Sequence, residues 1–137
     1  MTATREIPLP GIDPLTRPFW EGTKQHRLVM QRCPSCRRLH WLPSPSCQTC
    51  GNPELLWEQL KGVGTVYTFT IVHKVVRNTA FAKMTPYLIA VVELDEGPRM
   101  IADIQAESPD LVKIGSRVEV TFDDITPEIS LPRFRLV

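Results

Sequence analysis

The residues best suited to chemistry are the four cysteines of the chain, which form two Cys-x-x-Cys pairs. Cys33 and Cys36 make the first pair, and Cys47 and Cys50 make the second. Two thiolates separated by two residues can reach one metal ion from a single tight turn, and two such turns complete a tetrahedron. Structural Zn²⁺ sites have this ligand set, with Zn–S distances of about 2.3 Å. The spacing therefore predicts one structural zinc ion per chain, in a closed site without an open catalytic position.

Three other roles compete for these thiols. Two disulfides would use all four, but nothing in the sequence signals secretion. A redox pair would be one Cys-x-x-Cys in a βαβ setting, not two motifs around a hairpin. A nucleophilic cysteine would need a base, and His40 is the nearby candidate in the sequence. Zinc is favoured because it explains all four thiols together.

Each cysteine pair must be followed by a residue that lets the chain turn back. Gly51 follows the second pair, where such a turn usually needs a positive φ. Arg37 and Arg38 follow the first pair, so one of them is expected to be left-handed, at a cost of roughly 1 kcal/mol. With Arg32, these arginines would offset the negative charge of zinc bound to four thiolates.

The segment before the zinc module, residues 1–27, is expected to be an extended arm followed by a short helix. Four proline and glycine residues between positions 5 and 14 exclude a helix there. The helix should begin at Asp13–Pro14 or at Thr16 and end near Gly22. Its Phe19 and Trp20 would either pack on the protein's own core or contact a partner protein.

Strand-like segments make up most of the remaining chain. Within the zinc module, which spans 28–60, residues 28–32 are expected to be a strand that leads into the first cysteine pair. Residues 39–42 are expected to be the inner piece of its hairpin, and residues 55–60 lead out of the module. From residue 61 onward, a glycine-rich hinge with a bulge is followed by strands at 65–72, 87–94, 99–104, 118–122 and 133–137. A short helix starting at Ser108 and ending by Gly115 separates the third strand from the fourth. This order predicts that residues 61–137 form an OB-fold, a five-stranded Greek-key barrel, in a mainly β protein.

The loop between the first two barrel strands, residues 73–85, contains no acidic residue. Its basic residues are His73, Lys74, Arg77 and Lys83. Phe81 and Met84 are apolar, although the loop should lie on the surface. OB-folds often bind ligands at this loop. It is therefore expected to be a solvated loop with Phe81 folded onto the barrel, or a site for a phosphate-bearing ligand such as coenzyme A, or a contact with a protein.

Composition narrows the functional classes. Hydrophobic residues make up 42% of the 137-residue chain, as in an ordinary globular protein, and 13 prolines fit a fold rich in turns. The net charge of +1 argues against an electrostatic attraction to nucleic acid or membranes. The first six residues do not resemble a signal peptide, and the longest apolar run, 87–92, is too short to span a bilayer. A reducing, cytoplasmic location is expected.

With these motifs in view, the chain resembles a family of acyl-CoA-associated proteins, once labelled a domain of unknown function, that combine a rubredoxin-like zinc ribbon with an OB-fold. The resemblance starts near residue 13 and covers nearly the whole chain. Its motifs are the two cysteine pairs, Phe19–Trp20, residues 62–67, residues 86–97 and residues 132–134. Arg37 departs from a common glycine, and residues 42–45 depart from a usual double proline, but neither change removes a metal ligand.

The resemblance implies a role as a non-catalytic accessory or scaffold subunit of a thiolase-like acyl-CoA enzyme. Members of the family accompany lipid-transfer-type thiolases or aldolases, for example in steroid side-chain breakdown, and some are fused to a hydratase domain. Because the chain stops at Val137, no fused enzyme is expected here. The residues expected to contact a partner or CoA are Phe19, Trp20, Lys74, Arg77, Phe81 and Lys83.

Two other functions compete with the accessory role. An OB-fold that binds single-stranded nucleic acid needs a basic groove with stacking aromatic residues. Tyr67, Phe69 and Tyr87 could stack, but their alternation fits a core equally well, and the net charge is nearly zero. An independent enzyme would need a nucleophile–base pair or paired carboxylates, whereas the acidic residues at 93–96 lie at a hairpin end and are expected to be solvated.

Overall fold

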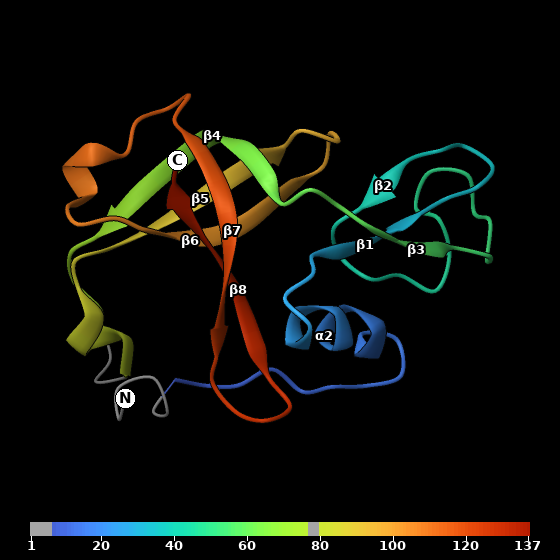
Figure 1. The fold of residues 1–137 in the computed structure, drawn as a ribbon, viewed down its shortest axis with the longest axis horizontal. Coiled ribbons are helices and arrows are strands. Elements are labelled where there is room, and N and C mark those ends of the chain that lie inside the picture. The colour runs from blue at the N-terminus through green and yellow to red at the C-terminus, as the bar shows by residue number, and fades with distance from the viewer. Residues whose placement is uncertain (1–6, 77–79) are drawn as a thin grey trace.

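The computed structural model describes residues 7–76 and 80–137. Figure 1 shows two β-structured parts side by side, with a small three-stranded sheet at one end, a barrel at the other and helix α2 between them. None of the helices in the described ranges is long and apolar enough to cross a membrane. The mainly β fold predicted from the sequence is confirmed, with one short helix, a ribbon and a barrel.

Helix α2 spans Arg17–Lys24 and begins after a reciprocal turn. The backbone N–H of Thr16 donates to Asp13 Oδ1 at 2.8 Å, and the N–H of Asp13 donates to Thr16 Oγ1 at 3.2 Å. The prediction of a short helix that ends near Gly22 is confirmed, since its eight residues make about two turns and it ends two residues later, at Lys24. Gly22 also allows close packing, since a Cβ there would lie 2.9 Å from Val29 Cγ2.

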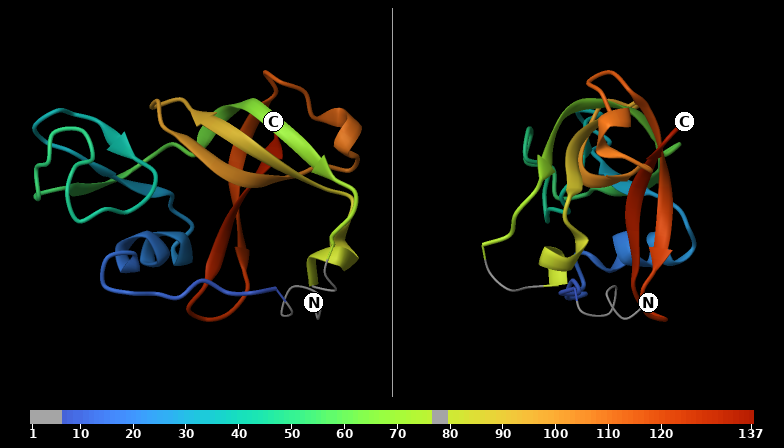
Figure 2. Two further views of the ribbon diagram at one scale, coloured as in Figure 1. Left: turned by 180° about the vertical axis from the view of Figure 1, so that it is seen from behind. Right: turned by 90° about the vertical axis from the view of Figure 1, so that its left-hand side faces the viewer.

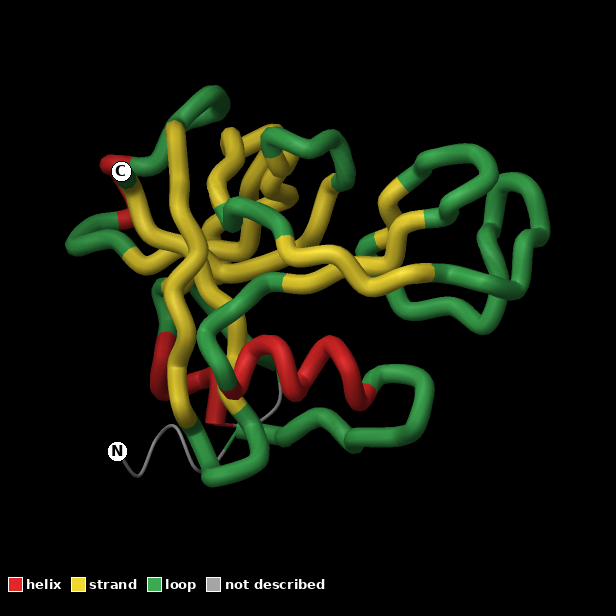
Figure 3. The backbone as a smooth tube through the Cα atoms, turned by 45° about the vertical axis from the view of Figure 1, so that its right-hand side comes forward, coloured by secondary structure: helices red, strands yellow, loops and turns green. Residues whose placement is uncertain are grey.

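The ribbon is an antiparallel sheet in the order β2-β1-β3. Its strands are β1 (Val29–Arg32), β2 (Leu39–His40) and β3 (Leu56–Gln59). Gln31 on the central strand faces His40 on one side and Trp57 on the other. Strand β1 leads directly into Cys33, and the loops that carry the remaining cysteines form the outer part of the ribbon (green in Figure 3).

The barrel contains five strands and closes in the order β4-β5-β6-β8-β7, with β4 paired to β7. The strands are β4 (Val63–Val72), β5 (Tyr87–Leu94), β6 (Arg99–Gln105), β7 (Arg117–Asp124) and β8 (Ser130–Leu136). Strands β6 and β8 run parallel, and all other pairs are antiparallel. This is the Greek-key barrel of an OB-fold, and Figure 2 shows its closure from two sides.

Two short 3₁₀-helices lie in the barrel's connections. Helix η1 spans Ala80–Met84 in the loop before β5, and η2 spans Pro109–Leu111. The side chain of Ser108 accepts a hydrogen bond from the N–H of Asp110, as the predicted capping role requires. The predicted bulge at residues 62–64 is wrong, because the register shifts between Val66 and Thr68. Gly64 is needed for another reason, since a Cβ there would lie 2.5 Å from the carbonyl oxygen of Glu93.

One hydrophobic cluster joins the helix, the ribbon and the barrel. Phe19 of α2 and Met30 of β1 belong to it, together with barrel residues such as Val92 and Phe134. The inner part of the ribbon is therefore packed on the barrel, whereas its outer part extends beyond this core.

Candidate functional site

Two loops with the same backbone hydrogen bonds present the four cysteines. In the first loop, Cys33 O accepts from the N–H of Arg37 at 2.8 Å, and Cys33 N–H donates to Arg38 O at 2.9 Å. In the second, Cys47 makes the equivalent bonds with Gly51 and Asn52, at 2.9 and 2.8 Å. The two loops are thus matching knuckles, each turning back just after its second cysteine.

The two knuckles differ at the residue in left-handed conformation. That residue is Gly51 in the second knuckle, with φ 82°, and Arg37 in the first, with φ 69°. The prediction that Arg37 or Arg38 takes this conformation is confirmed. A non-glycine residue there carries a steric cost that glycine avoids.

The sulfur atoms of the four cysteines converge on one point, with all of them within 4.8 Å of one another. Each short contact joins the two knuckles, since Cys33 Sγ lies 3.5 Å from Cys50 Sγ, and Cys36 Sγ lies 3.5 Å from Cys47 Sγ. A tetrahedral ion with four sulfur ligands at about 2.3 Å would separate them by about 3.8 Å. The cysteines are free thiols and not disulfides. The arrangement therefore fits a metal ion with four sulfur ligands.

Local hydrogen bonds set the acidity of the thiols. The backbone amide of Cys50 has the largest effect on Cys47 and, with the amide of Thr49 and the ring of His40, lowers the pKa of Cys47 to about 5. For Cys50, the amide of Asn52 favours the thiolate, but the neighbouring sulfur of Cys33 and burial outweigh it and raise the pKa to about 11. The protein thus favours a thiolate at Cys47 more strongly than at Cys50.

His40 lies beside the sulfur cluster, with Nε2 3.2 Å from Cys47 Sγ. Sequence reasoning treated this residue only as a candidate base. In the structure it is placed to donate a hydrogen bond to a sulfur that already belongs to the four-cysteine set. The single signal in the sequence was its position on the strand that follows the first knuckle.

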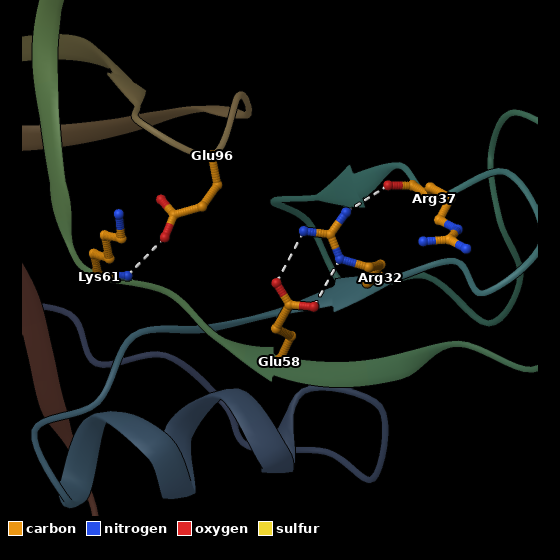
Figure 4. Close-up of polar contacts among 5 residues, drawn as sticks. All are labelled: Arg32, Arg37, Glu58, Lys61 and Glu96. Carbon is orange, nitrogen blue, oxygen red and sulfur yellow. Dashed lines mark hydrogen bonds and ion pairs between the residues drawn. The ribbon is translucent and has the colours of Figure 1, made fainter.

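Arg32 braces the first knuckle. Its Nε and Nη2 donate to the two carboxylate oxygens of Glu58 at 2.7 and 2.9 Å, and its Nη1 donates to the carbonyl oxygen of Arg37 at 2.6 Å (Figure 4). The charge of Arg32 is therefore matched by Glu58 on β3. The expected role of Arg32 in offsetting the thiolate charge stays a prediction, and its hydrogen bond to the carbonyl oxygen of Arg37 also fixes the turn after Cys36.

The acidic residues at 93–96 are held by specific partners. Arg99 Nε lies 3.1 Å from Glu93 Oε2, and Arg117 contacts both carboxylate oxygens of Asp95 at 2.7 and 2.9 Å. Glu96 Oε2 accepts from the backbone N–H of Lys61 at 2.8 Å and ties the ribbon–barrel linker to the β5–β6 turn (Figure 4). The side chains of Glu93 and Asp95 are 46% and 38% exposed, as expected for solvated charge at a hairpin end, and each is also paired with an arginine.

The two aromatic residues expected to contact a partner differ in exposure. Phe19 is only 8% exposed and belongs to the core cluster, so it offers almost no surface to another protein. Trp20 is partly exposed and packs edge-on against Phe19, with ring centroids 5.0 Å apart. Trp20 also lines an apolar groove of about 280 Å³ with Trp41, Leu42 and Pro43 of the ribbon, which we call the tryptophan groove. Sequence reasoning did not name Trp41 and Leu42 for this role.

The loop between the first two barrel strands divides into basic and apolar parts. Lys74 and Lys83 are exposed, whereas Phe81 is half-buried. Phe81 packs near Tyr87, with ring centroids 6.1 Å apart, as in the alternative that folds Phe81 onto the barrel. Arg77 lies outside the described residues. The role of these residues in binding CoA or a partner stays a prediction.

The aromatic residues considered for nucleic-acid stacking already have contacts within the chain. The guanidinium of Arg99 lies over the ring of Tyr67, 3.8 Å from its centroid. Phe69 packs against the core cluster, and Tyr87 lies beside Phe81. This arrangement does not favour stacking of bases on the barrel.

Fold and site together define a protein with a four-cysteine ribbon joined to an OB-fold barrel. Two family models match it: the ChsH2 rubredoxin-like zinc ribbon domain over residues 20–55, and the ChsH2 C-terminal OB-fold domain over residues 57–123. A DUF35 domain-containing scaffold protein of Methanocaldococcus jannaschii is 34% identical over 105 residues, which cover 75% of this chain and 73% of that protein. The chain belongs to the DUF35 family.

Two further comparisons found a curated relative and a solved structure that are similar to the chain. A probable enoyl-CoA hydratase alpha subunit of Thermomonospora curvata is 38% identical over 118 residues, which cover 85% of this chain. The chain matches only 36% of that protein's length. A chain of a solved structure described as the Ltp2-ChsH2(DUF35) aldolase is 34% identical, with a TM-score of 0.81. That match covers 93% of this chain and 98% of the other.

Proposed function

We propose that this protein is a non-catalytic accessory subunit, or scaffold, of a thiolase-like acyl-CoA enzyme in the cytoplasm. The observation that carries the proposal is its similarity, over nearly the full length of both chains, to a chain of the Ltp2-ChsH2(DUF35) aldolase. A lipid-transfer-type thiolase or aldolase is therefore the proposed partner, and an acyl-CoA hydratase is the second candidate. The proposed context is the metabolism of lipids, steroid side chains or related acyl groups.

The metal centre supports a structural role. We assign one zinc ion to Cys33, Cys36, Cys47 and Cys50, because four thiolates with matching knuckles are the ligand set of structural zinc sites. Four protein ligands fill a tetrahedral ion, which leaves no position for water or substrate. The zinc would hold the shape of the ribbon and take no part in a reaction.

The tryptophan groove is the proposed contact with the partner enzyme. Its lining is almost wholly apolar, and Leu42 at its edge is 58% exposed. Exposed apolar surface of this kind often marks a protein interface, and aromatic anchors often dominate its binding energy. Phe19, which is 8% exposed, also lines the groove and supports Trp20 from the core.

We also propose that the loop between the first two barrel strands, residues 73–85 (the basic loop), contributes to CoA binding. Lys74 and Lys83 are exposed, and Arg77 lies between them in the sequence. If the loop lay near the mouth of the partner's CoA tunnel, its positive charge would favour the phosphates of CoA. This part of the proposal can fail without affecting the scaffold role.

Purification of the tagged protein from its native cell tests the scaffold role. The expected result is a stable complex that contains a thiolase-like enzyme, with acyl-CoA turnover that is absent from the isolated accessory protein. Co-purification with nucleic acid and without such an enzyme would contradict the proposal. So would acyl-CoA turnover that follows the isolated protein through a sizing column.

Substitutions in the complex locate the contact surfaces. Trp20→Ser and Leu42→Ser should each weaken the complex at least about tenfold, the loss that corresponds to 1.4 kcal/mol. Leu111→Ser is the matched control, because Leu111 is also exposed and apolar but lies on η2 and does not line the groove. If all three substitutions weaken the complex equally, the groove is not part of the interface.

The CoA contribution has a separate test. Lys74→Glu and Arg77→Glu should raise the apparent CoA dissociation constant of the complex while the complex itself stays intact. If complex formation weakens and CoA affinity does not change, the loop contacts the partner and the CoA part of the proposal is wrong.

A further inference from the structure

An apolar pocket lies on the barrel, at the end of the molecule opposite the ribbon. Its volume is about 330 Å³. Strands β5 and β6 and the start of β8 form its floor, and helix η1 and the N-terminal arm form its sides. Figure 2 shows the arm running beneath the barrel toward η1. The apolar residues that line it include Ile7, Pro8, Phe81, Met84, Ile89 and Leu131.

The location of the pocket fits ligand binding. The second and third strands of an OB-fold, with the loop between the first and second, form the face on which such barrels bind ligands. Here those elements are β5, β6 and the loop that contains η1. Ile89 points outward from β5 and is 36% exposed, although strand residues on either side of it are buried. The described protein therefore leaves apolar surface uncovered in this pocket.

The charged residues of the pocket neutralise one another in part. They are Asp103, Asp123 and Arg133. The guanidinium of Arg133 donates to Asp103 through Nε at 2.7 Å, and its Nη1 lies 3.5 Å from Asp123 Oδ2. Two carboxylates thus share one guanidinium, and the group carries a formal charge of −1. By itself this group of three side chains does not attract a phosphate, sulfonate or carboxylate, because the cation is already matched and the excess charge is negative.

We propose that this pocket binds an uncharged apolar group about as large as a two-ring hydrocarbon. Its volume is near the lower end of ligand pockets in proteins, which runs from about 300 Å³ upward. The apolar walls supply the binding free energy by removing hydrocarbon from water, and the ion-paired edge rejects anions. The inference goes beyond the partner role. The pocket shares no lining residue with the tryptophan groove or the metal centre, although Phe81 and Met84 belong to the loop proposed above to contribute to CoA binding.

Two naphthalene dyes with different charges test the proposal on the zinc-bound protein. Prodan is neutral, and anilinonaphthalene sulfonate carries one negative charge. Prodan should bind saturably, one molecule per chain, with a blue shift of its fluorescence. The sulfonate should bind at least about tenfold more weakly, because a charged group loses its hydration in an apolar pocket.

Matched substitutions test whether prodan binds in this pocket. Ile89→Asp should weaken prodan binding at least about tenfold, since it puts a carboxylate into the pocket wall. Ile101→Asp is the control, because Ile101 is 54% exposed on the neighbouring strand β6 but does not line the pocket. Ile101 pairs with Val91 on β5. This pair lies two residues along the strands from the pair of Ile89 and Asp103, on the same face of the sheet. Both substitutions change exposed side chains, and circular dichroism should confirm that the fold is retained.

A double substitution tests the charge argument in the opposite direction. Changing Asp103→Asn and Asp123→Asn together leaves Arg133 without a carboxylate partner in the pocket. The sulfonate dye should then bind at least about tenfold more tightly than to the unchanged protein. Three results would overturn the proposal: no saturable prodan binding to folded protein, equal binding by Ile89→Asp, or tighter binding of the sulfonate than of prodan to the unchanged protein.

Discussion

The ribbon and the barrel are held together by different means. The barrel closes five strands of seven to ten residues around aliphatic and aromatic side chains. The ribbon has strands of two to four residues, and its outer part is loop around four sulfur atoms. So small a module cannot bury enough apolar surface to be stable by itself, and a metal ion commonly supplies the missing free energy. Hydrophobic burial therefore stabilises the barrel, and metal binding should stabilise the ribbon.

The boundary between these two regimes lies within the ribbon. Leu28 and Met30 belong to the barrel's hydrophobic cluster, whereas Cys33 begins the sulfur cluster at the far end of the same strand. Polar contacts lie near this boundary. The side chain of Arg32 donates to Glu58, and the backbone N–H of Lys61 donates to Glu96 (Figure 4). Loss of metal should therefore loosen the outer part and leave the inner part attached to the barrel.

Removing a metal ligand should give the largest effect. Cys47→Ser is expected to abolish zinc binding and to unfold residues 33–55, because the thiolate cluster is the main support of that segment. The barrel should keep its fold. Two-dimensional amide NMR should show a loss of dispersed signals from the outer ribbon only, and metal analysis should find less than one zinc ion per chain.

A neighbouring substitution separates loss of the ligand from damage to the loop. Gln48→Ala changes an exposed side chain of the same knuckle and should retain one zinc ion. If Cys47→Ser retains one zinc ion per chain and an ordered ribbon, metal binding does not stabilise the ribbon. The comparison of ribbon and barrel also fails if a chelator unfolds the barrel together with the ribbon.

A cavity in the barrel should give the next largest effect. Phe134 is fully buried and lies between Ile104 of β6 and Val120 of β7. Phe134→Ala is expected to lower the free energy of unfolding by about 3–5 kcal/mol while zinc stays bound under native conditions. Ile101→Ala, on the exposed side of β6, should cost less than about 1 kcal/mol. Denaturant unfolding measures both, and similar losses would show that the barrel does not depend on its core.

Sequence reasoning succeeded where neighbours in the chain determine the structure. The two cysteine pairs, the left-handed residue after the first pair and the cap at Ser108 follow from local spacing. It failed where tertiary contacts decide. The close contact between Gly22 and Val29 could not be read from the sequence, although the helix does end near Gly22. The brace between Arg32 and Glu58 joins two strands, and no local pattern indicates it.

The tryptophan groove and the barrel pocket were missed for the same physical reason. Trp41 and Leu42 follow β2 as two large apolar residues in a loop, a signal that could have suggested exposed apolar surface. Their proximity to Trp20, however, depends on how α2 packs against the ribbon. In the barrel pocket, Asp103 and Arg133 meet only because the third and fifth strands are brought together by closure of the sheet.

Weakening the brace on the first knuckle should have a smaller effect. Arg32→Met removes the bonds to Glu58 and to the carbonyl of Arg37, and it should speed zinc loss to a chelator about fivefold, equivalent to about 1 kcal/mol. The pKa of Glu58 is lowered, chiefly by its hydrogen bond from Arg32. The stability that this pairing contributes is therefore fully present above the ordinary pKa of a glutamate and is lost as the pH falls through the lowered pKa of Glu58. Arg38→Met changes an exposed arginine of the same turn and should leave the rate unchanged.

The left-handed residues of the two knuckles should give the smallest effects, with opposite signs. Arg37→Gly relieves a positive φ and should stabilise the metal-bound ribbon by at most about 1 kcal/mol, because a more flexible unfolded chain offsets part of the gain. Gly51→Ala should destabilise it by about 1 kcal/mol. A Cβ at Gly51 would meet no atom within 4 Å, so its cost reports backbone conformation alone. Thermal unfolding of the zinc-bound ribbon by NMR measures both changes. A large loss from Arg37→Gly would mean that the arginine side chain stabilises the first knuckle beyond the cost of its conformation.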